Sequence, residues 1–561
     1  MKKIFSLLLL LGVALYVAAV PVERIPRLLT LADGSQIIAM PCGDEYYSWF
    51  ETADGQVIEE SEAGYFISQR SLAQHQASVR AARSIMPRKI GSQATAALPA
   101  IGSPKIPVIL VNFSDSVFHT KPTPTELCTY FDLFCNGTRD GIRYTEHGSY
   151  GAIRDYYSDQ SQGQFTPEFD IIGIVTLPNP ESYYGSNGSG KDSRFSQFCT
   201  DAITQAMNAY PDVDWTRFSN RGNDRVDMVF FVFAGCGEHN GGGATTIWPK
   251  WKAVSLNVNG VSFYSALCGS ENRPTTKNGV VTSVRPDGIG VLCHEMNHAL
   301  GLPDFYDVNG KAFGMDLWSI MDYGQYANNG YLPSSMTSYE REFMGWLKID
   351  ELTTSGWLTL DPLGKDGKAY KIVNDENPGE YYIIENRQAV GWDEGVCGFG
   401  HGLMVTHVDY NAGKWSGNTV NTDTKHQRMT IIAANNRYIG TSIKTASMND
   451  IIETWRGNLY PFVYYKNGQE ICNDSLTAYS TPAATVYTPA GFMNKDLHGI
   501  VENNDKSVSV YFGDDFTVGI TAPASKPANP APHVIYDLSG RRVLLPSKGI
   551  YVIDGRKVVI P

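Results

Sequence analysis

A histidine, a glutamate and a second histidine occupy positions 294, 295 and 298 of the stretch "VLCHEMNHALGLPDFYD", residues 291–307. On a helix, His294 and His298 lie on the same face one turn apart, so both imidazoles can bind one metal ion. Zinc suits such a pair, because it accepts nitrogen ligands and imposes no geometry of its own. Glu295 can then take a proton from a water molecule that zinc has acidified. The pentapeptide alone is equally compatible with a surface helix that carries two histidines.

Residues downstream of the pentapeptide favour the metal site. Gly301 follows His298 by three positions, where a left-handed turn would bring the chain back toward the metal. Asp304, three positions further on, can supply a carboxylate as the third ligand. Met321 in "WSIMDYG" can form an apolar floor under the metal, and Tyr323 follows it closely. The spacing therefore predicts three protein ligands and one open position, as catalytic rather than structural zinc sites have.

The third ligand has two rivals in the sequence. Asp307 would replace Asp304 if the turn after the helix were longer. Glu340 in "TSYEREFMGWL" would replace it if a downstream helix supplied the ligand, as in thermolysin-like sites. Gly301 and Met321 together favour Asp304.

These motifs resemble those of the metzincin zinc peptidases, in which HExxHxxGxx precedes a third ligand and a later Met-turn. The aspartate ligand, with "GLPDFYD", "SYGAIRDYYSDQSQGQF", "VDMVFFVFAG" and "EYYIIENRQAVGWDEGVCGFGHGLMVTHVDY", is similar to the immune inhibitor A-type metallopeptidases. The similar motifs run from about residue 105 to 435. The resemblance implies a secreted zinc endopeptidase that cleaves proteins or peptides, is made as a zymogen and is often stabilised by calcium.

The resemblance also implies roles for single residues. The ligands and the general base would be His294, His298, Asp304 and Glu295, with Met321 as the Met-turn residue. In some metzincins a tyrosine at the position of Tyr323 stabilises the oxyanion that develops on the substrate carbonyl. Packing beside the Met-turn is the alternative role for this tyrosine.

The stretch "MPCGDEYY" offers two candidates for keeping a zymogen latent. A thiolate is a good zinc ligand, so Cys42 could fill the open coordination position, and the carboxylate of Asp44 could do the same. If the N-terminal segment is removed, eight of the nine cysteines remain, which leaves Cys42 as the odd one. A structural role for Cys42 is the alternative.

Strand and helix signals alternate around the motif. "KIPVILVNFSD" and "DRVDMVFFVFAG" are continuous apolar runs typical of strands buried on both faces, and "DSRFSQFCTDAITQAMNAY" has helical spacing up to Pro211. This alternation predicts an α/β arrangement. Together with the resemblance, it implies an α/β (α+β), metzincin-like catalytic domain over 101–350, with a mixed sheet and an active-site helix. Short strand-like runs predict a β-rich companion domain over 351–515.

Both ends of the chain carry segments associated with export. Residues 1–19 have the charged start, apolar core and Val17-x-Ala19 ending of a signal peptide, a membrane anchor being the alternative. Residues 20–100 predict a propeptide with Asp-Gly hairpins and a basic linker, or else an ordinary N-terminal domain. A Pro/Ala linker (516–534) precedes the tail 535–561, whose "IYDLSGRRV" resembles type IX secretion sorting domains. That resemblance implies contact with secretion machinery and a secreted or cell-surface location.

Composition excludes some function classes and leaves others open. The net charge is −12 without a long basic run, which argues against nucleic acid as a partner. No stretch after the signal peptide approaches the roughly 20 apolar residues of a membrane-spanning helix. A non-catalytic surface adhesin and a structural metal-binding protein remain alternatives, although a binding protein would not need Glu295.

Two further sets of residues could bind metal. His401 and His407 flank "GLMV" and could form a second site, with a structural role as the alternative. Asp224 and Asp227 could bind calcium with other oxygens, or they are solvated turn carboxylates. Cys293 is expected to pack the back of the active-site helix.

Overall fold

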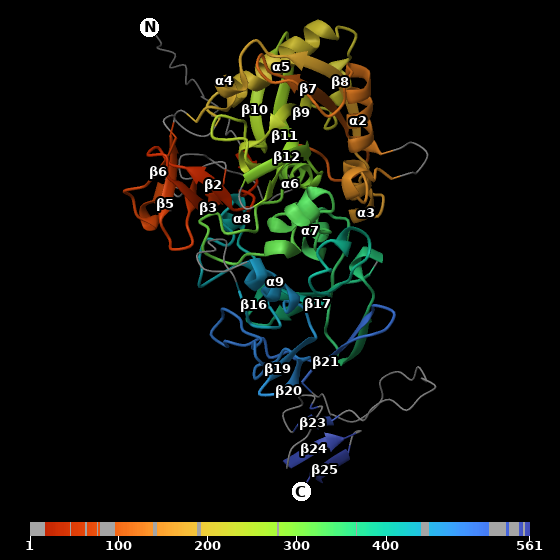
Figure 1. Cartoon of the computed structure of the whole chain (residues 1–561). Coiled ribbons are helices and arrows are strands. Elements are labelled where there is room, and N and C mark those ends of the chain that lie inside the picture. The colour runs from red at the N-terminus through yellow and green to blue at the C-terminus, as the bar shows by residue number, and fades with distance from the viewer. Residues whose placement is uncertain are drawn as a thin grey trace, which may run out of the picture.

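The computed structural model describes residues 17–44, 47–61, 64–75, 77–78, 96–137, 143–187, 192–277, 280–365, 367–438, 448–514, 535–537, 543, 549–553 and 556–560. Most of the predicted signal peptide, most of the basic linker and all of the Pro/Ala linker lie outside these residues. The predicted mixed α/β class is confirmed. β-rich regions precede and follow the part predicted to be catalytic, residues 101–350, which is called the catalytic part below (Figure 1).

The largest sheet has seven strands in the order β1-β10-β11-β9-β7-β8, with β12 beside β11. Strands β11, β9, β7 and β8 are parallel neighbours, whereas β10 runs antiparallel to β11 and pairs with β1 on its other side. The bounds are Val17–Ala19 (β1), Lys105–Asn112 (β7), Glu168–Thr176 (β8), Arg225–Cys236 (β9), Lys250–Val258 (β10), Val261–Lys277 (β11) and Val280–Pro286 (β12).

Helices cover both faces of this sheet. They are α2 (Pro124–Asn136), α3 (Ile153–Gln160), α4 (Glu181–Gly185), α5 (Phe195–Ala209), α6 (Gly290–Ala299) and α7 (Ser338–Phe343). Because side chains alternate along a strand, β7 sends Val108 and Leu110 into the core shared with α2, α3 and α6. Its Ile109 and Val111 enter the core on the α5 side. The two predicted buried strands and the helix that ends before Pro211 are thereby confirmed.

Helix α6, which carries the HExxH motif, lies against β11 and β10 in the middle of the molecule (Figure 1). A Cβ atom on Gly269 of β11 would come within 2.4 Å of the Leu292 side chain, so this glycine allows the helix to approach the strand closely. Cys293 is fully buried in the same core, as expected. All ten residues of α6 are buried, which excludes the surface-helix alternative.

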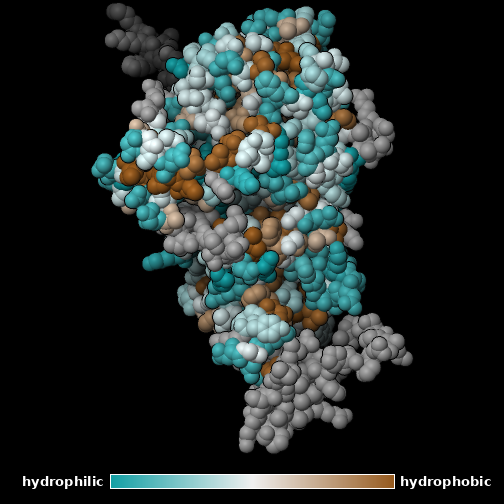
Figure 2. All heavy atoms as spheres, in the orientation of Figure 1, coloured by the Kyte–Doolittle hydropathy of each residue, from teal (hydrophilic) through white to brown (hydrophobic). Residues whose placement is uncertain are grey.

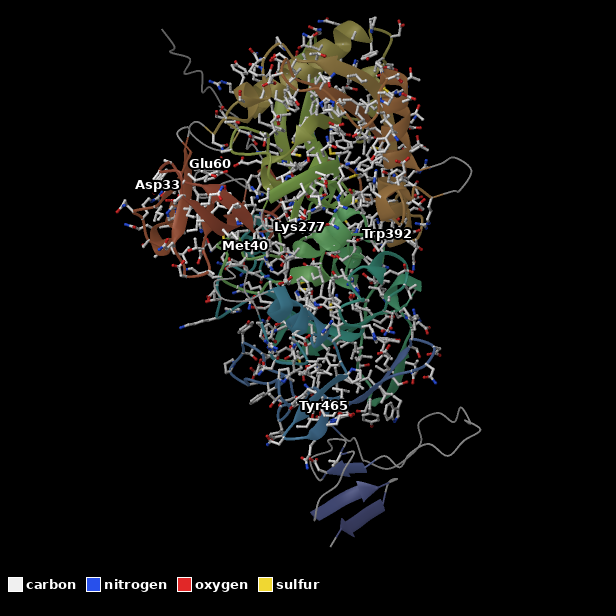
Figure 3. The ribbon with its side chains drawn as sticks, in the orientation of Figure 1. Asp33, Met40, Glu60, Lys277, Trp392 and Tyr465 are labelled. Atoms are coloured by element: carbon white, nitrogen blue, oxygen red, sulfur yellow. The ribbon has the colours of Figure 1, made fainter. Side chains whose placement is uncertain are left out.

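The β-rich companion lies below the catalytic part in Figure 1. Its sheets are β13-β15-β16-β17-β18, β14-β22-β21 and β19-β20. Trp392, labelled in Figure 3, joins the two parts. Its ring centroid lies 5.0 Å from that of Tyr156 in α3, and its Nε1 donates to Asp159. The bounds are Asp350–Glu351 (β13), Gly356–Leu360 (β14), Tyr370–Asn374 (β15), Asn377–Arg387 (β16), Gly402–Asp409 (β17), Ala412–Ser416 (α8), Met429–Ile431 (β18), Met448–Arg456 (α9), Phe462–Lys466 (β19), Gln469–Asn473 (β20), Leu497–Glu502 (β21) and Val508–Phe512 (β22).

The N-terminal sheet β2-β3-β4-β5-β6 projects from the side of the body (Figure 1). Asp33-Gly34 and Asp54-Gly55 turn the chain between its strands, as predicted, with φ of 86° and 85° at the glycines. Its outer surface exposes apolar side chains (Figure 2), among them Ile38, Phe66 and Ile67. The strands are Arg27–Thr30 (β2), Gln36–Gly43 (β3), Ser48–Glu51 (β4), Val57–Ser61 (β5) and Gly64–Ile67 (β6).

The C-terminal tail contributes a separate three-stranded sheet of β23 (Ile535–Asp537), β24 (Gly549–Ile553) and β25 (Arg556–Ile560). None of the helices within the described ranges combines the length and the apolar character needed to cross a bilayer.

Candidate metal centre

The two histidines of α6 are completely buried and fixed by backbone carbonyls. Nδ1 of His294 lies 2.8 Å from the carbonyl oxygen of Ile320, and Nδ1 of His298 lies 2.7 Å from that of Leu302. A carbonyl only accepts, so each Nδ1 carries the hydrogen and each Nε2 keeps a free lone pair. The two Nε2 atoms are 3.0 Å apart and face each other.

Asp304 completes the group after a sharp turn. Gly301 adopts a φ of 103° at the end of α6, the left-handed turn expected from its position. Oδ1 of Asp304 then lies 3.2 Å from Nε2 of both His294 and His298. Among the described residues, these three form the one group of three or more histidine, cysteine or acidic side chains whose ligand atoms lie within 4.8 Å.

The donor set fits a zinc ion. Two imidazole lone pairs and one carboxylate oxygen converge in a site that excludes water, and Oδ1 of Asp304 has no hydrogen-bond partner. Acceptors held together in this way are costly without a cation between them. Nitrogen and carboxylate ligands of this kind are those that zinc takes in catalytic sites.

Glu295 lies beside this group with one oxygen fixed and the other unpartnered. The backbone N–H of Trp251, on the edge strand β10, donates to Oε2 at 2.6 Å, while the buried Oε1 has no partner. Burial raises the pKa of Glu295 well above its ordinary value, and the backbone N–H groups of Trp251 and Val20 oppose this rise. One carboxylate oxygen is therefore available for proton transfer in a water-poor site.

A residue that the sequence does not single out orients the aspartate. Asn418 is fully buried and comes from the β-rich companion. Its Oδ1 accepts the backbone N–H of Asp304 at 2.7 Å, and its Nδ2 donates to Oδ2 of the same aspartate. The pair is 114 residues apart in the chain, so no local pattern could have indicated it.

The Met-turn residues lie directly after the carbonyl that holds His294. Met321 is fully buried, and its carbonyl oxygen accepts the backbone N–H of Phe305 at 2.9 Å. Tyr323 is 8% exposed, and the guanidinium of Arg24 lies 3.3 Å from the centre of its ring. Burial, partly opposed by Arg24, raises the pKa of Tyr323 to about 12, so its hydroxyl stays protonated as a donor.

The rival ligands are used elsewhere. Asp307 accepts backbone N–H groups at 2.8 to 2.9 Å within its own loop. Glu340 caps α7, where it accepts the N–H of Thr337 at 2.6 Å and the hydroxyl of Ser319 at 2.5 Å. Neither carboxylate belongs to the histidine–aspartate group.

The two latency candidates lie near the site but outside the ligand group. Cys42 and Asp44 are buried on the N-terminal sheet and line a small cavity together with Tyr306, Asp307 and Tyr323. The thiol of Cys42 donates to the carbonyl oxygen of Met40 at 3.6 Å. Within the described residues, neither side chain is part of the convergent group, and their role in latency stays a prediction.

The other predicted metal residues lie apart from the convergent group. His401 lies 2.8 Å from Glu502, and His407 lies 2.8 Å from Glu380. Asp227 is buried and accepts the backbone N–H of Arg221 at 3.0 Å. Asp224 is exposed in a left-handed turn conformation. These contacts supply the local partners that a structural role requires.

Comparison with known proteins shows which family the catalytic part matches. Residues 95–348 match the family described as Immune inhibitor A peptidase M6, catalytic domain. Immune inhibitor A of Bacillus thuringiensis subsp. alesti is 26% identical over 237 residues, 36% of this chain and 33% of the relative. Pre-pro-metalloprotease PrtV of Vibrio cholerae serotype O1 (strain M66-2) is 28% identical over 236 residues, 36% of this chain and 25% of the relative. The matches thus span a quarter to a third of these relatives. The resemblance to the immune inhibitor A-type metallopeptidases is confirmed, whereas the resemblance of the tail to sorting domains stays a prediction.

Proposed function

We propose that the protein is a secreted zinc metalloendopeptidase that hydrolyses peptide bonds of proteins, because residues 95–348 match the family described as Immune inhibitor A peptidase M6, catalytic domain. The observation that carries the proposal is the convergence of His294, His298 and Asp304. Beside them lies the carboxylate of Glu295, of which one oxygen is hydrogen-bonded and the other is not. The name of the family and those of its relatives support a metallopeptidase.

The residues would share the chemistry as follows. Zinc, held by His294, His298 and Asp304, would polarise the scissile carbonyl and acidify a water molecule. Glu295 takes the proton of the attacking water and passes it to the leaving nitrogen. Its raised pKa suits this double role, because a carboxylate that accepts a proton readily holds it until the leaving nitrogen needs it. The hydroxyl of Tyr323 would donate to the oxyanion.

The intact chain would be a zymogen, since its own N-terminal segment covers the site. After loss of residues 1–19, Val20 would still pack with Trp248 and Val291, and Arg24 would still cover Tyr323. Export through residues 1–19 and contact of the tail 535–561 with type IX secretion machinery are proposed from the sequence, as is calcium as a structural ion.

The test is proteolysis of an unfolded protein substrate by the matured, zinc-loaded chain and its Glu295→Ala variant. We expect the rate to fall at least about 100-fold, the usual range for loss of a general base, while zinc content stays the same. Glu453→Ala, at a carboxylate that is 55% exposed and far from α6 in sequence, is the matched control and should keep full activity.

Equal activity of Glu295→Ala and the unaltered chain would refute Glu295 as the base. No activity in either, with full zinc occupancy and the N-terminal segment removed, would favour a non-catalytic surface adhesin instead.

A further inference from the structure

The segment Val20–Arg24 runs through the site as an extended peptide. Strand β1 before it pairs antiparallel with β10, with Ala18 opposite Trp251 and Ala19 opposite Lys250. The indole Nε1 of Trp248 donates to the carbonyl oxygen of Val20 at 3.1 Å. An extended peptide added to an exposed sheet edge is a common way of binding substrate segments.

Val20 lies in an apolar cluster beside the active-site helix α6, which contributes Val291 to that cluster. The side chain of Val20 is fully buried and packs with Trp248 and Val291.

Four residues further on, the side chain of Arg24 enters an acidic pocket. Its Nη1 lies 3.3 Å from Oδ2 of Asp316, and its guanidinium lies over the ring of Tyr323. The other oxygen of Asp316 accepts Nε1 of Trp455 at 3.2 Å. A cavity of about 130 Å³ adjoins the arginine, and its lining includes Leu317, Tyr326, Ile451 and Trp455.

Asp316 depends on this arginine for its charge balance. The carboxylate is 1% exposed, and among the described residues Arg24 is its only ion-pair partner. Its backbone has a φ of 47°, so the surrounding loop holds it in a strained conformation at this place. When the N-terminal segment leaves, a nearly buried negative charge faces the site without a cation, which is costly unless another cation enters.

We propose that the Asp316 pocket is a substrate subsite for a basic side chain, which Arg24 fills in the intact chain. The proposal rests on the peptidase function proposed above and specifies its substrate class. The enzyme would select peptides that carry arginine four residues after an apolar residue, the spacing from Val20 to Arg24.

The test uses peptides with the sequence of residues 17–26, "VAAVPVERIP", and the matured, zinc-loaded chain. We expect kcat/KM to fall about tenfold when the arginine is replaced by alanine, the factor that corresponds to 1.4 kcal/mol. Replacement of the arginine by glutamate should lower kcat/KM further. A peptide with the arginine one position earlier should be cleaved no faster than the alanine peptide. A second measurement is calorimetric binding of the same peptides to the Glu295→Ala variant, which needs no turnover.

The protein variant that tests the pocket is Asp316→Asn. Asparagine keeps the shape, tolerates the left-handed backbone and still accepts from Trp455, so it removes the charge alone. In this variant the arginine and alanine peptides should be cleaved and bound equally. Asp423→Asn, at an exposed turn aspartate, is the matched control and should keep the preference.

Equal cleavage of the arginine and alanine peptides by the unaltered enzyme would overturn the subsite and leave the peptidase function intact. If no peptide or protein is cleaved at all, the peptidase proposal fails. The binding measurement then decides the subsite by itself, and equal affinity for the two peptides would overturn it.

Discussion

Two clusters of histidine and carboxylate groups lie in different halves of this protein and differ in how their acceptors are satisfied. In the β-rich companion, Nε2 of His407 lies 2.8 Å from Glu380, and Nε2 of His426 lies 2.6 Å from Asp409. Each histidine there has a carboxylate of its own. In the catalytic part, the two imidazoles share a single oxygen of Asp304 and face each other.

The remaining contacts of the carboxylates sharpen the difference. Glu380 also accepts the N–H of Tyr487 at 2.6 Å and the amide of Asn374 at 2.9 Å, so both of its oxygens are used. Oδ1 of Asp304 has no donor at all. Residue type alone therefore does not indicate a metal site. Buried acceptor atoms that converge without a hydrogen-bond donor do indicate one, because a cation between them offsets the cost of burying them.

The largest expected effect comes from removing one ligand in each cluster. His298→Ala should lower zinc affinity more than about 100-fold, beyond the 10- to 100-fold that loss of a ligand's supporting partner costs. His407→Ala should leave zinc affinity unchanged. Competition with a chromophoric chelator measures both variants under the same conditions.

A fall in zinc affinity in His407→Ala would contradict the comparison, because it would mean that the cluster around His407 binds zinc. Unchanged affinity in His298→Ala would mean that the group around His298 does not bind it.

A smaller effect is expected from the residue that orients Asp304. Asn418→Gly removes both side-chain contacts with the aspartate while suiting the φ of 51° at this position, and zinc affinity should fall by about tenfold. Asn436→Gly is the matched control, since Asn436 is exposed and has the same φ. Equal zinc affinity in both variants would show that Asp304 needs no support from the companion domain.

The contrast between Asp304 and Asn418 also shows what the sequence could predict. The two histidines, the turn glycine and the aspartate all lie in the short stretch from His294 to Asp304. Helix geometry and one glycine turn therefore suffice to bring the ligands together. The buried strands were predictable for a similar reason, since burial on both faces leaves a continuous apolar run. Each of these features is encoded locally.

The missed features depend on contacts between distant segments. Asn418 reaches Asp304 across 114 residues. Val20 packs with Trp248 and Arg24 lies over Tyr323, contacts that the sequence did not indicate, whereas the latency role of Cys42 and Asp44 stays a prediction. An asparagine or an arginine in a polar stretch has no periodicity that indicates its partner, so only the folded arrangement reveals these contacts.

The smallest effect is expected within the satisfied cluster, from Glu380→Gln. Burial alone would raise the pKa of Glu380, but the hydrogen bonds from His407 and the backbone of Tyr487 hold it below its ordinary 4.5. A lowered pKa means that the folded chain binds this proton less tightly than the unfolded chain. The carboxylate therefore stabilises the fold fully above about pH 4.5, and this contribution is lost as the pH falls through the lower folded value.

Glutamine keeps the shape but cannot ionise, so the variant should be less stable by about 2 kcal/mol at neutral pH, the scale of hydrogen bonds to a charged group. The difference in thermal midpoint between the two proteins should narrow below pH 4.5, whereas zinc affinity should not change at any pH where the fold persists. Glu453→Gln, at an exposed carboxylate, should shift neither quantity. A difference that stays constant into acid would assign the loss to packing rather than charge, and the two clusters would then no longer differ in how charge is used.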